Sequence, residues 1–141
     1  MTGPNERAST GSAVGSAAGS AVGSAATRDT CLFCRIADGS IPADRLHDDD
    51  LVVAFRDIGP QAPTHILLIP RRHIASAAEL TEADGPLLGR LFAVAAELAR
   101  TSGIADGGYR LVSNVGRWGG QTVDHLHFHL MGGRPFDWPP G

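Results

Sequence analysis

The amino-acid sequence predicts an α+β domain built on a largely antiparallel sheet. One segment, 81–100, carries apolar residues at helical spacing, and short segments of strand-like composition lie on both sides of it. Strands and helices do not alternate along the chain, so a parallel βαβ arrangement is not expected. We expect about five strands, one long helix and one short N-terminal helix, all within residues 29–141.

The short helix comes first in this domain and is followed by strands. Leu32, Phe33 and Ile36 fall on one side of a short helix that Gly39 can end. Strands are then expected at 44–47, 51–56, 65–69, 109–114 and 122–130. The first two should form a hairpin, because three aspartates between them favour a turn.

The long helix is expected between Thr81 and Arg100. Thr81 or Asp84 can cap its start, and Gly103 can supply its end. An apolar stripe at helical spacing is expected to face the core: Leu87, Leu88, Leu91, Phe92, Ala95 and Leu98.

Residues 1–28 differ in composition from the rest of the chain. Positions 8–27 are a GSA[AV] repeat without a charged or aromatic residue, so a disordered tail is expected. This segment also lacks the large apolar residues of a membrane span or a secretory signal, which predicts a cytoplasmic protein without a membrane partner. The formal net charge of −3 argues against a nucleic-acid partner, and a small ligand is expected instead.

Three of the six histidines lie at alternate positions near the end of the chain: His125, His127 and His129. Because strand side chains alternate between two faces, this spacing places the three rings on one face. Leu126, Phe128 and Leu130 then form the apolar face. Imidazole serves as a nucleophile, a proton carrier or a metal ligand near neutral pH. The alternation therefore predicts a chemical site on one face and core on the other.

Both cysteines of the chain lie in a single CxxC motif, Cys31–Cys34. In a reducing compartment this spacing indicates either half of a metal site or a redox pair.

The run 125–131, HLHFHLM, resembles the His-φ-His-φ-His-φ-φ signature of the histidine triad (HIT) family of nucleotide hydrolases and transferases. The similarity continues through 55–74, through Gly119-Gly-Gln-Thr122 and into the Trp-Pro-Pro-Gly ending. That ending resembles the Hint branch, the purine nucleoside phosphoramidases, more than the dinucleoside polyphosphate hydrolases. The resemblance implies the antiparallel fold described above and a homodimer whose two sheets join. It also places Trp138 near the partner's site, although Trp138 could instead simply pin the C-terminal segment.

The resemblance also assigns roles to the site residues. His127 matches the nucleophile that becomes a nucleotidyl-histidine, His129 assists proton movement toward the leaving group, and His65 orients or polarises the triad. The hydroxyl of Thr122 is a further donor near the leaving atom. Nucleotide contacts are expected at positions that match the family: Asp57 and Ile58 for the nucleoside, Asn114, Gly120, Gln121 and Thr122 for phosphate, with His127 and His129.

The resemblance further implies a zinc site made by Cys31, Cys34, His73 and His125. Two thiolates and two imidazoles make a closed tetrahedral site, which is structural rather than catalytic. The alternative is that the cysteines are reduced core thiols and His73 is a surface residue.

Taken with the resemblance, the sequence predicts a hydrolase that cleaves the P–N bond of purine nucleoside 5′-phosphoramidates, with zinc but no organic cofactor. The alternatives within the family are a dinucleoside polyphosphate hydrolase or a nucleotidyl transferase. Two further alternatives are a non-catalytic nucleotide-binding interaction protein and a CxxC redox protein.

Overall fold

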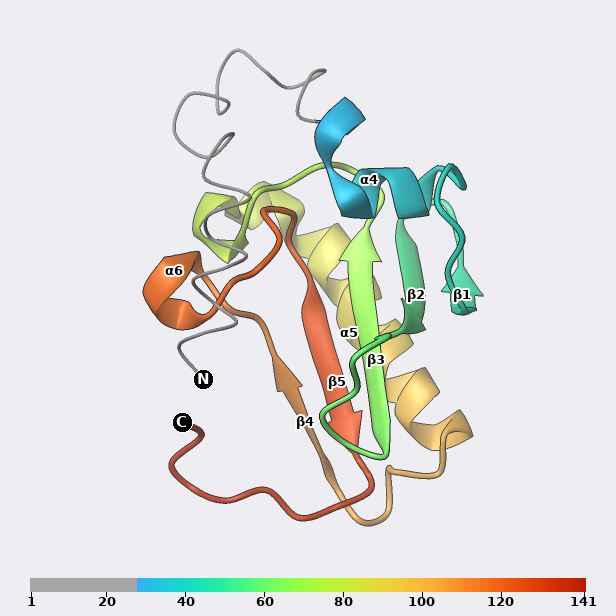
Figure 1. The fold of residues 1–141 in the computed structure, drawn as a ribbon, viewed down its shortest axis with the longest axis vertical. Coiled ribbons are helices and arrows are strands. Elements are labelled where there is room, and N and C mark those ends of the chain that lie inside the picture. Colours follow the sequence, from blue (N-terminus) through green and yellow to red (C-terminus); the bar gives the residue numbers. More distant parts are fainter. Residues whose placement is uncertain (1–27) are drawn as a thin grey trace.

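The computed structural model describes residues 28–141, so the predicted tail lies outside the described residues apart from Arg28 (Figure 1). One antiparallel sheet has the strand order β1-β2-β3-β5-β4. Its strands are β1 (Arg45–Asp48), β2 (Val52–Arg56), β3 (Thr64–Pro70), β4 (Tyr109–Val112) and β5 (Phe128–Gly132). The helices are α4 (Leu32–Ala37), α5 (Gly85–Thr101) and the single turn α6 (Gly116–Gly119). The predicted fold class and the β1–β2 hairpin are confirmed.

The central strands bury both of their faces. Val52 and Ala54 of β2 pack with α5, whereas Val53 and Phe55 pack with α4 on the other face. The same alternation continues through β3, because successive strand side chains point to opposite faces. Figure 1 shows α5 behind the sheet and α4 across the ends of β2 and β3. The site described below lies on the α4 face.

The long helix begins later than expected. Thr81 and Asp84 form a capping box, which closes a 3₁₀ turn over Glu82–Asp84, and α5 starts only at Gly85. The predicted stripe is largely buried, but Phe92 is 51% exposed. At the other end, Gly103 has a φ of +77° and ends the helix as predicted. No helix within residues 28–141 is long and apolar enough to cross a bilayer.

The last strand begins at Phe128, six residues later than predicted. If β5 began earlier in the same register, the ladder with β3 would place Leu126 opposite Pro70, which has no N–H to donate. The amide of Leu126 instead donates to the carbonyl of Ile74, and the Ser113 hydroxyl donates to the carbonyl of His127. Residues 121–127 therefore form a loop held by tertiary hydrogen bonds, and His125 and His127 precede the strand. The prediction that all three histidines share one strand is wrong in this respect.

The short helix α4 is confirmed, with one difference in its predicted apolar side. Phe33 and Ile36 are buried, whereas Leu32 is exposed. Both cysteines are also buried on the inner side of this helix, and Cys31 caps it by accepting a hydrogen bond from the amide of Cys34. The inner side of α4 therefore carries the two sulfurs and the Phe33 ring.

Candidate functional site

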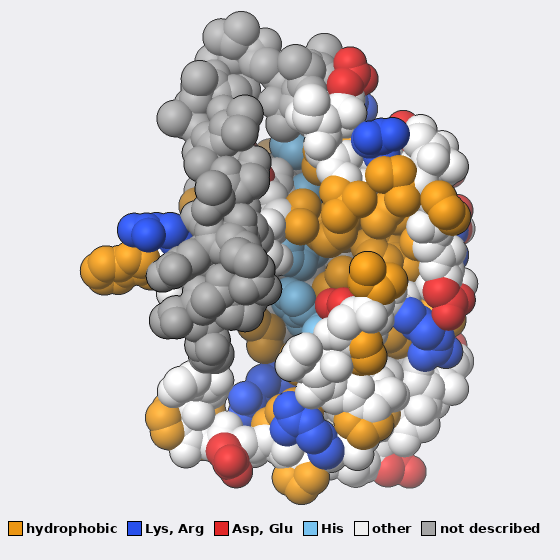
Figure 2. All heavy atoms as spheres, in the orientation of Figure 1, with side chains coloured by type: hydrophobic (Ala, Val, Ile, Leu, Met, Phe, Trp, Pro, Cys, Tyr) orange, Lys and Arg blue, Asp and Glu red, His pale blue; other side chains and the backbone are white. Residues whose placement is uncertain are grey.

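The predicted separation of faces holds along 125–130. Leu126 and Leu130 are buried in the core against α5. On the opposite side, His125 and His127 are buried and His129 is half-buried. Figure 2 shows the histidine side chains gathered in a row on this face. The alternation of side chains is therefore kept through the loop as well as the strand.

The ring of His127 is held in one tautomer by the backbone. Its Nδ1 lies 2.7 Å from the carbonyl oxygen of His125. A carbonyl oxygen only accepts, so Nδ1 carries the proton and donates it, which leaves Nε2 of the neutral ring with a free lone pair. The edge-on ring of Phe33, 5.1 Å from that of His127 between centroids, packs against it. His127 therefore presents an unprotonated nitrogen from a fixed ring.

His65 and His129 form a second, linked pair. The amide of Gln61 donates to Nδ1 of His65 at 3.0 Å, so the proton of neutral His65 is on Nε2. That Nε2–H lies 2.8 Å from Nδ1 of His129 and donates to it. Neutral His129 must then carry its own proton on Nε2. A chain of hydrogen bonds that starts at a backbone amide thus leaves His129 with an N–H donor at Nε2, the ring nitrogen that does not bond to His65.

Burial keeps these rings uncharged in the free protein. It lowers the pKa of His127 and of His65 below the ordinary imidazole value. Burial, followed by repulsion from protonated His127 and His65, lowers the pKa of His129 to about 4. At neutral pH the lone pair of His127 is consequently available for attack.

Asp57 lies beside this pair, just after β2. One carboxylate oxygen accepts from the amide of Gly59 at 2.8 Å, and the other lies 3.3 Å from Nε2 of His65. Asp57, His65 and His129 could be taken as a metal site, since their ligand atoms lie within 4.8 Å of one another. However, the Gln61 amide keeps a proton on Nε2 of neutral His65, which removes one lone pair that a metal would need. This arrangement suits proton transfer, with the carboxylate as counter-charge.

The glycine-rich loop is held by its own hydrogen bonds. The amides of Gly120 and Gln121 donate to carbonyls of α6, at Arg117 and Gly116 respectively. Gln121 is buried, and its side chain accepts from the Gly116 amide and donates to the carbonyls of Ala75 and Val123. These two amides hold the turn in this structure, whereas they were expected to face phosphate.

The remaining predicted residues lie at differing depths. Thr122 and Asn114 are half-buried, on the two loops that flank α6. Ile58 is fully exposed at the tip after β2. Trp138 is 83% exposed, so within this chain it does not pin the C-terminal segment.

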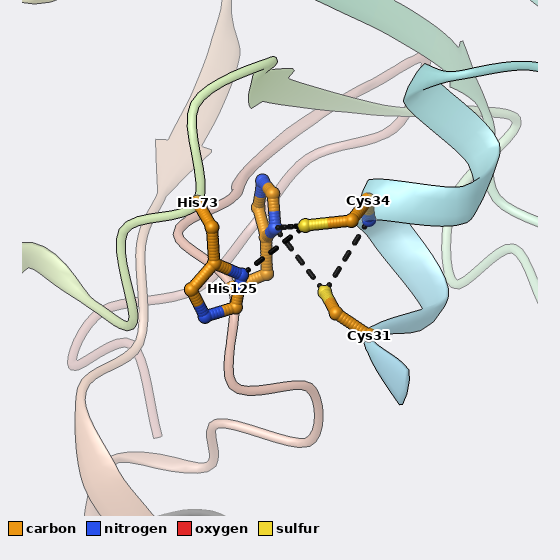
Figure 3. A group of neighbouring side chains, drawn as sticks. All are labelled: Cys31, Cys34, His73 and His125. Carbon is orange, nitrogen blue, oxygen red and sulfur yellow. Dashed lines mark hydrogen bonds between the residues drawn. The ribbon is translucent and has the colours of Figure 1, made fainter. Parts of the chain in front are cut away.

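A second cluster of ligand atoms joins α4 to the loops after β3 and before β5 (Figure 3). Sγ of Cys31 lies 3.3 Å from Nδ1 of His125, and Sγ of Cys34 lies 3.3 Å from Nδ1 of His73 and 3.5 Å from Nδ1 of His125. The usual Zn–N and Zn–S bond lengths give donor separations of about 3.5 Å in a tetrahedron. The four predicted metal ligands are therefore brought together at the spacing of a zinc site.

The orientation of His125 also fits a metal. Its Nε2 donates to the carbonyl of Pro70 at 2.8 Å, so Nδ1 turns a lone pair toward both sulfurs. A hydrogen bond from the Cys34 thiol lowers the pKa of the Cys31 thiol. The same contact with Cys31, together with burial, raises the pKa of Cys34. One sulfur is thus readily a thiolate, as a metal ligand must be.

Several residues that shape the site were not foreseen from the sequence. The carbonyl of Pro70, the amide of Gln61 and the hydroxyl of Ser113 fix the orientation of the histidines or of their backbone. Two of these are backbone groups with no side-chain signal. Ser113 is adjacent to the predicted Asn114, but its bond to position 127 depends on how the loops pack.

Comparison with known proteins is consistent with this geometry. A family model described as the HIT domain matches residues 38–136. The purine nucleoside phosphoramidase of Escherichia coli K12 is 51% identical over 104 residues, which is 74% of this chain and 87% of that protein.

Solved structures show the same fold. The crystal structure of a HIT family hydrolase from Legionella pneumophila Philadelphia 1 superposes with a TM-score of 0.78 at 51% identity, covering 79% of this chain and all of the other. A HIT family hydrolase from Clostridium thermocellum gives 0.75 at 42% identity, covering 80% of this chain and 96% of the other.

Proposed function

Because this chain belongs to the HIT domain family, we propose that it is a hydrolase of the P–N bond in purine nucleoside 5′-phosphoramidates. The observation that carries the proposal is the fixed, neutral ring of His127, whose centroid lies 5.0 Å from that of His129, the ring with an N–H donor. The activity named for the Escherichia coli relative supports the choice of substrate.

The first step is attack by Nε2 of His127 on the phosphorus atom. A bond forms between nitrogen and phosphorus, and the electron pair of the substrate P–N bond leaves with the amine. That nitrogen takes a proton from Nε2 of His129. The negative charge of bound phosphate favours protonation of the His65–His129 pair, so this proton arrives with the substrate, and Asp57 supplies the counter-charge.

The second step is hydrolysis of the nucleotidyl-histidine. Water attacks phosphorus, its proton passes to His129, and the electron pair of the P–N bond returns to His127. The products are a nucleoside monophosphate and the free amine, and both histidines regain their starting state. Splitting the hydrolysis in this way replaces one difficult displacement by two easier ones.

Substrate binding follows from the positions of the other site residues. Asp57 accepts from the ribose hydroxyls and the exposed Ile58 covers the base, while Asn114 and Thr122 donate to phosphate. Since the amides of Gly120 and Gln121 hold the turn, we assign them to shaping this loop rather than to direct donation. The Thr122 hydroxyl is then the donor of this loop near the leaving group.

Cys31, Cys34, His73 and His125 would hold a zinc ion. With four protein ligands the ion leaves no open position for water, and it supplies a cross-link between α4 and the two loops. The thiols stay reduced in a compartment such as the cytoplasm, where we place the protein.

A homodimer through the β4 edge is also part of the proposal. Within residues 28–141, β4 is the last strand of the sheet, so its outer edge can pair with a strand of a second copy. Phe92 and Tyr109, which are 51% and 41% exposed, lie on α5 and β4 respectively. A second copy of this sheet would cover these apolar groups.

Hydrolysis of adenosine 5′-phosphoramidate and of diadenosine tetraphosphate tests the proposal. We expect P–N cleavage to be much faster, and to fall by about 10⁴-fold in His127→Ala. His47→Ala is the matched control, because His47 lies on β1, pairs with Asp49 and is outside both clusters. Rapid quenching in base and mass spectrometry should show AMP bound to the wild-type protein. Undiminished cleavage by His127→Ala, or preference for the tetraphosphate, would contradict the proposal.

A further inference from the structure

His125 connects the Cys/His cluster to the nucleophile His127. His125 belongs to the Cys/His cluster through its side chain, and its carbonyl oxygen accepts the hydrogen bond that fixes the tautomer of His127. Any movement of the His125 side chain that rotates its peptide therefore changes the direction of that oxygen. This bond, 2.7 Å between Nδ1 and the oxygen, weakens steeply when the oxygen turns away from the N–H direction.

A second connection runs through α4. Phe33 lies between Cys31 and Cys34 on this short helix. Its ring packs edge-on against His127, with centroids 5.1 Å apart, and against His125 at 6.0 Å. A helix of six residues is too short to be stable by itself, so its position depends on packing and on the contacts of its two sulfurs. The sulfurs thus determine where the Phe33 ring meets His127.

We propose that the Cys31/Cys34/His73/His125 centre, when it holds zinc, positions the nucleophilic His127 through the His125 carbonyl and the Phe33 ring. Phe33 and His125 are then positioning residues for the reaction, beyond the stabilising role of the centre. Attack on phosphorus is sensitive to such positioning, because a misplacement of about 1 Å costs up to about 10²-fold in rate. Only the kinetic part of this inference rests on the proposed function.

The first test observes His127 directly and needs no substrate. The full chain is labelled with ¹⁵N-histidine, and the ring nitrogens are recorded with zinc bound and after its removal by a chelator. With zinc we expect a single tautomer for His127, protonated at Nδ1. Without zinc we expect averaging between tautomers, while circular dichroism shows that the fold is kept. An unchanged His127 spectrum in folded, zinc-free protein would overturn the inference.

A substitution decides the matter if zinc removal unfolds the chain. Phe33→Leu keeps an apolar side chain but loses the ring edge, and Val53→Ala removes packing from the same apolar cluster without a ring. In the zinc-loaded Phe33→Leu protein we expect shifted His127 signals and a kcat lowered about 10-fold at an unchanged KM. Val53→Ala should lower the melting temperature alone. Equal spectra for Phe33→Leu and wild type would refute the second connection.

The two proposals fail in different ways. If the chain does not cleave phosphoramidates but zinc still fixes the His127 tautomer, the proposed function is wrong and the positioning role stands. If cleavage is fast and the spectrum ignores both zinc and Phe33, the function stands and the positioning role is wrong.

Discussion

The cluster around His125 and the cluster around His65 are built from similar parts but are suited to different chemistry. In each, the ligand atoms lie within 4.8 Å of one another. In each, histidines also lie beside a group that can lose a proton: the cysteine thiols in the first cluster and the Asp57 carboxyl in the second. The Pro70 carbonyl occupies Nε2 of His125 and frees Nδ1 for the sulfurs. The Gln61 amide occupies Nδ1 of His65 and so keeps a proton on Nε2. A single backbone partner therefore determines whether the ring can bind a metal or relay a proton.

The two clusters also differ in access to ligands. The Cys/His cluster is mostly buried and complete with four donors, whereas Asp57 and His129 are half-buried at the edge of the other cluster. A closed set of donors can stabilise the fold without exchanging with solvent. A half-open set can meet a substrate and return protons to water.

The largest expected effect comes from removing, separately, a ligand of the Cys/His cluster and the nucleophile. His125→Ala should lose bound zinc, and the free energy of unfolding should fall by on the order of 3 kcal/mol. His127→Ala should keep about one zinc per chain while losing turnover, and its free energy of unfolding should fall less than that of His125→Ala. Zinc analysis and chemical denaturation measure both properties on the same preparations. Loss of zinc in His127→Ala would show that the nucleophile and the Cys/His cluster are not separable.

A smaller effect should follow from removal of the backbone donor to His65. Gln61→Pro deletes the N–H group that fixes the tautomer, and Gln61→Ala keeps it. We expect kcat to fall at least about 10-fold in the proline variant, since the oriented proton donor is lost. The alanine variant should stay within about twofold of wild type. Similar kcat values for two folded variants would contradict the assigned tautomer chain.

The cluster of Asp57, His65 and His129 should also make the free energy of unfolding depend on pH. A histidine with a lowered pKa binds fewer protons in the folded state than in the unfolded state. The free energy of unfolding therefore has its full value above pH 6.5, the ordinary pKa of histidine. It falls as the pH drops from there toward the pKa in the folded state, which is about 4 for His129. Urea unfolding of zinc-loaded protein should show a fall of about 2 kcal/mol between pH 7 and pH 4.5. In His129→Gln the slope should be shallower, and equal slopes would contradict this origin.

The smallest effect is expected from the N-terminal tail. Both clusters are assembled from residues 31–129, so deletion of residues 2–27 should leave zinc content, melting temperature and kcat unchanged. A large loss of any one would show that the tail contributes to the domain.

The sequence predicted the architecture where local pattern controls it. Runs of strand-like composition identified β2 and β3, helical spacing identified α5, and alternating histidines identified the chemical face. Boundaries were less predictable because distant groups determine them. Thr81 closes a separate turn before α5, and Pro70 ends the ladder that β5 would otherwise extend.

The chemical identity of the site was more predictable than its protonation. The Cys/His cluster forms from the predicted residues, and His65, His129 and Asp57 meet as neighbours. Which ring nitrogen carries a proton depends on Gln61 and Pro70, whose backbone groups have no signature in composition or spacing. Such partners become visible only when the fold is known.

The buried side chain of Gln121 limits how freely this chain can change during evolution. It satisfies one backbone donor and two carbonyl acceptors on three segments. A replacement of similar size, such as glutamate or methionine, would leave at least one of these groups unpaired, at a cost of about 1–3 kcal/mol for each. Position 121 should therefore be among the least variable in natural or laboratory variants, although its side chain holds a loop and carries out no chemistry.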